Sequence, residues 1–136
     1  MNAKNWIELS DQQIVWQYRR DVPTDRIVKE LDKLMQRLNG LPTALLMDLR
    51  QIRYILPEDC EAIRRVYDHI ARYSLLDAVY LVDFRHYNRM RLLIQLNRFP
   101  NAGMVFKYEA DAADYLHEVV LKYRKHAMPQ STLANP

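Results

Sequence analysis

The stretch that decides the fold is TALLMDLRQIRYILPEDC, residues 43–60. Its first part, Thr43–Leu49, is an almost unbroken apolar run broken only by Asp48, and such a run is typical of a strand buried on both faces. Leu56-Pro57-Glu58-Asp59 then predicts the start of a helix, because proline suits the first turn and acids suit the positive end of the helix dipole. In α/β folds ligands sit beyond the carboxyl ends of strands, so the sequence from Asp48 to Asp59 is a candidate site.

The sequence on either side of this stretch predicts further strands and helices. Trp6–Leu9 and Gln13–Tyr18 are β-prone runs separated by Ser10-Asp11-Gln12, which predicts a hairpin. Apolar residues between 27 and 38 repeat at helical spacing, and Asn39-Gly40 ends that helix, since glycine suits the left-handed position after a helix. Downstream, the patterns predict a helix from Pro57 to about Ser74, a strand at Ala78–Val82, a helix around 90–96, a strand at Gly103–Tyr108 and a final helix through Tyr123.

This order of elements predicts an α/β fold with one mixed, mostly parallel sheet of about five strands, an N-terminal hairpin and about four helices. Residues 1–126 are expected to form one domain, and residues 127–136, which lack periodicity, a flexible tail. If the strands add in sequence order, right-handed crossovers place their helices on one sheet face. Ala44–Met47 supplies apolar residues to both faces, so the second face needs either a returning helix or a second subunit. We hypothesise a homodimer on that basis.

Composition bounds the class of protein. The chain has 136 residues, of which 49% are hydrophobic and 27% charged, as in ordinary globular domains. Its formal charge of +3 permits an anionic ligand but does not call for nucleic acid, which normally brings a denser basic stripe. Cys60 is the only cysteine, and neither a signal peptide nor an apolar run of about 20 residues is present, so we expect a cytoplasmic protein without an integral membrane segment.

Metal and cofactor sites find little support in the sequence. The four histidines have no short ligand spacing between them, and Cys60 stands alone, so no metal site is expected. With Gly40 and Gly103 as the only glycines, a phosphate-cradling glycine loop is excluded. We therefore expect no cofactor and no nucleotide-dependent catalysis.

The richest polar stretch is Asp83–Arg91, which follows a predicted strand and opens a helix. Its arginines, Arg85 and Arg89 among them, together with Arg50 and Arg53 from the preceding loop, could receive phosphate or carboxylate, and His86 could act as an acid or base. The alternative interpretation is a solvated loop and basic helix face whose arginines pair with Asp83 or Glu58. Both interpretations stay open from sequence alone.

Three features together resemble the STAS domain, and specifically its SpoIIAA-like branch. They are the opening hairpin WIELSDQQIVWQYR followed by a helix, the strand that ends in Asp48-Leu49-Arg50 before a loop and Pro57-Glu58-Asp59, and the segment AVYLVDFRHYNRM before a short third helix. The resemblance covers roughly residues 6–123 and implies a regulatory, non-catalytic domain.

One position departs from the family pattern. STAS regulators that resemble anti-sigma-factor antagonists carry a phosphorylatable serine in an Asp-Ser-Ser-Gly-like turn after the Asp-bearing strand. Here Ile55–Asp59 has no hydroxyl and no glycine, so the resemblance does not imply a phosphorylation switch of that kind. Glu58 and Asp59 place negative charge where a phosphate would add it, although helix N-termini favour acids for dipole reasons alone.

These observations predict a non-catalytic regulatory or protein-interaction module of STAS/SpoIIAA-like type, homodimeric, with a filled core. The second interpretation is a small-molecule or lipid carrier, which requires a deep apolar cavity and holds an anionic head group on arginines. The third is an enzyme, which requires His86 beside an acid in a cleft. The candidate binding residues are Asp48, Arg50, Arg53, Glu58, Asp59, Arg85, His86 and Arg89.

Overall fold

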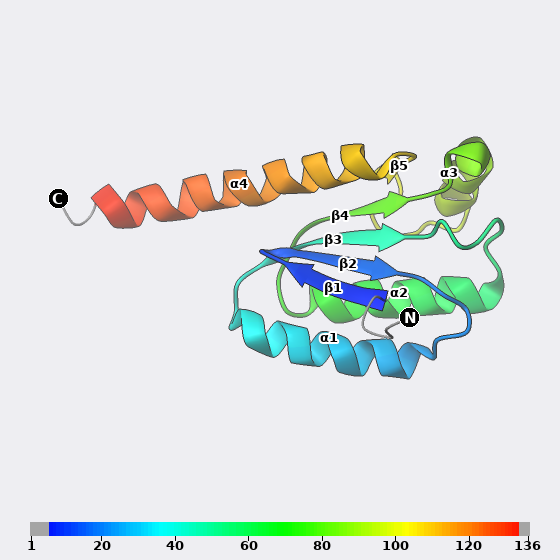
Figure 1. The fold of residues 1–136 in the computed structure, drawn as a ribbon, viewed down its shortest axis with the longest axis horizontal. Coiled ribbons are helices and arrows are strands. Elements are labelled where there is room, and N and C mark those ends of the chain that lie inside the picture. Colours follow the sequence, from blue (N-terminus) through cyan, green and yellow to red (C-terminus); the bar gives the residue numbers. More distant parts are fainter. Residues whose placement is uncertain (1–5, 134–136) are drawn as a thin grey trace.

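The computed structural model describes residues 6–133, and their side chains through residue 127 (Figure 1). The chain forms an α/β fold, which confirms the predicted class. Its elements are β1 (Ile7–Ser10), β2 (Gln13–Gln17), α1 (Thr24–Leu38), β3 (Thr43–Asp48), α2 (Pro57–Ala71), β4 (Leu75–Leu81), the short 3-10 helix η2 (Phe84–His86), α3 (Tyr87–Leu96), β5 (Val105–Phe106) and α4 (Glu109–Leu133).

The five strands form one mixed sheet in the order β1-β2-β3-β4-β5, which the sequence could not fix. β1 is antiparallel to β2, and the remaining neighbours are parallel, as predicted. The register aligns Val15, Leu46 and Val79 across the three central strands. All six residues of β3 are buried, because this strand lies at the centre of the sheet and is covered on both faces.

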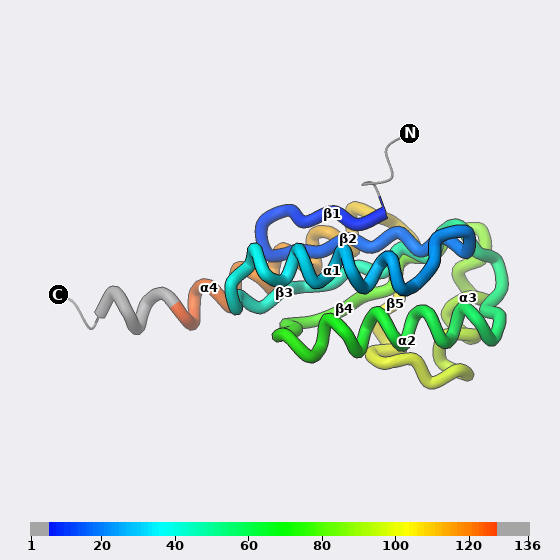
Figure 2. Tube along the Cα trace, turned by 90° about the horizontal axis from the view of Figure 1, so that it is seen from below, coloured from blue at the N-terminus to red at the C-terminus, as the bar shows by residue number. Residues whose placement is uncertain are grey.

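Helices cover the two sheet faces unequally (Figures 1 and 2). α1 and α2 lie side by side on one face, where the fully buried Trp16 and Tyr80 belong to the larger core. On the other face α4 buries Leu116 and Val120 against the alternate residues of β3 and β4. The second face is therefore covered by the returning helix, and the homodimer hypothesis loses the observation that motivated it.

Two predicted strands have different bounds in the structure. β4 begins at Leu75, three residues before the predicted Ala78; the pattern was obscured by Asp77, whose carboxylate is accommodated because it accepts hydrogen bonds from the Ala78 N–H, Asn101 and the Tyr115 hydroxyl. β5 contains only Val105 and Phe106, because just these two residues pair with β4.

The predicted tail at 127–136 also needs correction. Residues 127–133 continue α4 as a helix, and 134–136 lie outside the described residues. Extending a helix already formed requires no new nucleus, so periodic side chains are not needed for each added turn. α4 consequently projects well beyond the sheet in Figure 1. Within the described residues, no helix is both long and apolar enough to cross a membrane.

Candidate functional site

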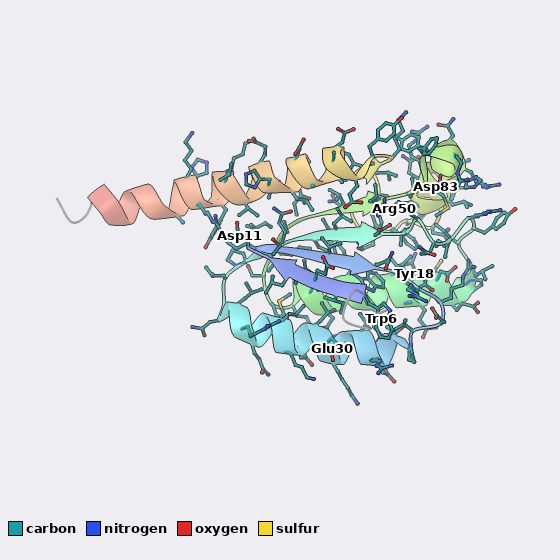
Figure 3. All side chains as sticks on the ribbon, viewed as in Figure 1. Trp6, Asp11, Tyr18, Glu30, Arg50 and Asp83 are labelled. Carbon is teal, nitrogen blue, oxygen red and sulfur yellow. The ribbon has the colours of Figure 1, made fainter. Side chains whose placement is uncertain are left out.

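The candidate residues gather at one end of the molecule, where the parallel strands β2 to β5 end (Figure 1). Because parallel strands point the same way, the segments that follow them meet at one edge. Figure 3 shows Tyr18, Arg50 and Asp83 at this edge and Asp11 at the opposite one. We call the side chains of residues 50–58, 83–96 and 107–109 the carboxyl-end surface.

The first acid at this edge, Asp48, is paired with Arg50. Asp48 is 4% exposed and accepts from the Arg50 backbone N–H and Nε, both at 3.0 Å, and from Nη2 at 2.7 Å. The same Nη2 lies 3.0 Å from Glu109 Oε1 at the start of α4. Arg50 therefore neutralises a buried carboxylate and joins the end of β3 to α4, a contact between residues distant in sequence that no local pattern predicts.

The second acid, Asp59, is fully buried in the first turn of α2. It accepts hydrogen bonds from the Tyr18 hydroxyl, from Arg20 Nη2 at 2.9 Å and from the Leu56 N–H at 2.8 Å. Burial alone would raise the pKa of Asp59, but the bonds from Arg20, Tyr18 and Leu56 outweigh it and hold that pKa below its usual range. Burial, followed by the hydrogen bond to Asp59, raises the pKa of Tyr18. Asp59 is an internal anchor between β2 and α2 and does not face a partner.

The neighbouring Glu58 is exposed, and no hydrogen bond or ion pair of the described residues involves its side chain. Arg53 is likewise exposed in the loop before α2, without an ion pair in the described part of the chain. These two predicted site residues are available to solvent, whereas Asp48 and Asp59 are not.

The third acid, Asp83, caps the short helix η2. Its carboxylate accepts from the Arg85 backbone N–H at 2.8 Å and from Arg85 Nη2 at 2.7 Å. The Arg85 side chain, then its backbone N–H, lowers the pKa of Asp83. The interpretation that an arginine of this stretch pairs with Asp83 is thus confirmed for Arg85, whereas Glu58 pairs with no arginine of residues 6–127.

Arg89 and Lys107, two of the remaining cations at this end, have aromatic partners instead of acids. The Arg89 guanidinium lies 4.8 Å from the centre of the Tyr54 ring, and its Nη2 lies 2.9 Å from His86 Nδ1. Lys107 Nζ lies 5.3 Å from the centre of the Tyr87 ring. Among residues 6–127, neither cation forms a salt bridge. Sequence reasoning missed Lys107 because the strand predicted at Gly103–Tyr108 contained it, whereas β5 ends at Phe106.

Two open depressions, each of about 390 Å³, lie between these loops. Phe84, Arg85 and Lys107 line both of them, and Arg50 joins them in the second. The loops after β3 and β4 therefore converge, which the sequence could not establish. The first depression, which we call the cationic depression, is lined by Phe84, Arg85, His86, Tyr87, Asn88, Arg89 and Lys107.

Exposed apolar side chains surround these charges. Leu92 and Leu96 on α3 are 53% and 67% exposed. Phe84 and Tyr108 are also exposed, and their rings stack with centres 6.4 Å apart. Contiguous patches of large apolar side chains are rare on the surfaces of monomeric proteins, and where they occur they mark interaction sites.

The other two interpretations, an enzyme and a carrier, each require a particular geometry. An enzyme would need His86 beside an acid, but the observed partner of its Nδ1 is Arg89. A carrier would need an enclosed apolar cavity, whereas both depressions at this end are open to solvent and have charged side chains in their lining. Within the described residues, no three His, Cys, Asp or Glu side chains gather as a metal site would require.

Comparison of the chain with protein-family models found no match, and neither curated proteins nor solved structures gave one. The resemblance to STAS domains accordingly stays a prediction from sequence pattern, and the geometry above carries the functional argument.

Proposed function

We propose that this chain is a non-catalytic, cytoplasmic interaction module of STAS/SpoIIAA-like type that binds an acidic partner protein through its carboxyl-end surface. The observation that carries the proposal is a charge asymmetry. The carboxyl-end surface contains six of the twenty Lys and Arg residues and three of the seventeen acids, so the rest of the chain has fourteen of each. This surface therefore carries the whole formal charge of +3, and the segment 84–108 within and beside it contains no acid.

The apolar residues of the same segment favour a protein as the partner. Arginine and aromatic residues are enriched in the cores of protein interfaces, and here Phe84, Tyr108 and Leu92 accompany Arg89. Such anchors supply most of the binding free energy, while surrounding charges supply orientation and association rate. A surface with both components fits an acidic protein better than it fits a small solute.

The buried ion pairs support this role indirectly. Asp48 with Arg50, and Asp59 with Arg20, fix the loops after β3 and β2, so the surface is held in place before a partner arrives. Preorganised surfaces bind with a smaller loss of conformational entropy. We therefore propose fewer partner-contacting residues than the sequence suggested. Arg53 and Arg89 stay candidates for contact with the partner, whereas Asp48 and Asp59 hold the loops that carry this surface.

Cross-linking capture from cells that make the protein tests this proposal. We compare wild type with Leu92→Ser/Leu96→Ser and with the matched control Leu41→Ser/Leu121→Ser, which alters two exposed leucines elsewhere. A partner that binds through this surface should be retained by wild type and the control, and weakened about 30-fold by the α3 variant, since each truncated anchor costs about 1 kcal/mol or more. If every captured protein is retained equally by the α3 variant, the proposed surface is wrong.

A further inference from the structure

The cationic depression has an unusual lining. Its charged members are Arg85, Arg89 and Lys107, and no carboxylate of the described residues lines it. Asn88, which is exposed at the start of α3, adds an amide group. Arginine and lysine side chains donate hydrogen bonds and accept none. The depression is therefore surrounded by donors that converge from η2, α3 and the end of β5.

The hydrogen bond between Arg89 and His86 extends this donor set. Because the guanidinium can only donate, His86 Nδ1 is the acceptor at 2.9 Å. A neutral imidazole that accepts at Nδ1 carries its proton at Nε2. The Nε2–H group of His86 is thus another donor, and the hydrogen bond at Nδ1 holds Arg89 beside the depression.

The cations also keep donors free for a ligand. Arg85 uses Nε and Nη2 on Asp83, which leaves Nη1 unengaged by that pair. Lys107 rests against the Tyr87 and Tyr108 rings, 5.3 and 5.7 Å from their centres, and has no carboxylate partner among residues 6–127. Cation–π contacts are weaker than a desolvated ion pair, so an incoming anion can recruit this ammonium group.

We infer that the cationic depression binds a phosphate monoester, namely the phosphoryl group of a phosphorylated side chain on the partner. This inference rests on the proposed function, because it takes the partner to be a protein. A single arginine satisfies a carboxylate in a bidentate pair, as Arg85 already does for Asp83. Arg89 and Lys107, which have no carboxylate partner in the described part of the chain, and the free Nη1 of Arg85 match a phosphoryl group better, since it carries a charge of about −1.5 to −2 and three acceptor oxygens.

The size and walls of the depression agree with this ligand. Its volume of about 390 Å³ lies at the lower end of the range for small-ligand sites. Phe84 and Tyr87 provide aromatic walls for the carbon atoms that carry the phosphate. An open mouth suits a side chain presented by another protein, which must enter with its backbone outside.

Fluorescence anisotropy with a labelled acidic peptide that carries one phosphoserine, and with its unphosphorylated twin, tests the inference. The phosphopeptide should bind wild type at least tenfold more tightly than the twin. Arg89→Gln/Lys107→Gln should remove at least tenfold of the phosphopeptide affinity. Lys29→Gln/Arg37→Gln, which removes the same charge from exposed positions on α1, should change it less than twofold.

Three results would overturn the inference. The first is equal affinity for the two peptides, and the second is an equal loss in both double variants, which would indicate net charge alone. The third is binding of phosphatidic acid vesicles or inorganic phosphate through Arg89 and Lys107 without preference for the phosphopeptide, which would assign the site to another phosphate source. A chain that captures its partner through Leu92 and Leu96 but ignores peptide phosphorylation contradicts this inference and leaves the proposed function standing.

Discussion

Replacing Asp59 with asparagine tests the anchor that joins β2 to α2. The side chain is fully buried, and its two oxygens accept from Tyr18, Arg20 and the Leu56 N–H. Asparagine has nearly the same shape but no charge, and its amide group turns a donor toward one of these three donors. The substitution therefore leaves a buried donor unsatisfied and Arg20 without its counter-ion.

The expected loss follows from these contacts. Breaking a buried ion pair costs about 3–5 kcal/mol, but the Arg20 side chain is 40% exposed and regains water, so we expect about 3 kcal/mol. For a chain of 136 residues, an unfolding entropy of about 2.1 cal/mol/K per residue converts this into a Tm decrease of about 10 °C. The matched control is Glu58→Gln, at an exposed position where we expect a change within about 0.5 kcal/mol.

Urea unfolding followed by circular dichroism at several pH values measures the effect and its origin. The folded pKa of Asp59 is lowered, so its contribution is complete above the unfolded pKa of about 3.9 and disappears as pH falls through the folded value. The gap between wild type and Asp59→Asn should thus be widest above about pH 5 and shrink below pH 4. A gap under about 1 kcal/mol at pH 7, or one that does not change in acid, would refute the anchoring role.

Three further substitutions probe other parts of the fold. Leu116→Ala in α4 should lower the free energy of unfolding by about 2–5 kcal/mol, because this side chain fills the core on the second sheet face, and a loss below 1 kcal/mol in urea unfolding would argue that α4 does not dock there. Arg50→Gln should cost about 2 kcal/mol at pH 7 by leaving Asp48 buried without a counter-ion, and a loss under about 0.5 kcal/mol in thermal unfolding would count against that pairing. Tyr80→Phe removes a 2.6 Å hydrogen bond to the Pro100 carbonyl and should cost about 1 kcal/mol in urea unfolding, so an unchanged midpoint would count against that bond.

The features that were predicted correctly from the sequence are those that local patterns encode. The apolar run at 43–49, the proline at 57 and the turn at 10–12 each act within a few residues, so the central strand, the start of α2 and the hairpin follow from them. The α/β class then follows from the order of elements, because parallel strands require crossover helices.

The rest depends on residues that are distant in the chain. In the sequence, Asp59 has the pattern of a helix-capping acid. Its partners Tyr18 and Arg20 lie about forty residues upstream, and no motif links them to it. The pair between Arg50 and Glu109 likewise exists only because α4 returns to the carboxyl-end surface. Local sequence specifies neither contact, and for this reason the predicted site included buried anchors and omitted Lys107.

The order of strands in the sheet also bears on how the chain acquires its structure during synthesis. Each strand pairs with the one made just before it, so the sheet can grow one strand at a time with short loop closures. Only α4 must come back across strands that were completed much earlier. Until α4 docks, Ala44, Leu46 and Val79 form an uncovered apolar strip. A ribosome-bound chain that stops before residue 109 lacks α4 and exposes this strip to solvent. Exposed apolar strands promote aggregation.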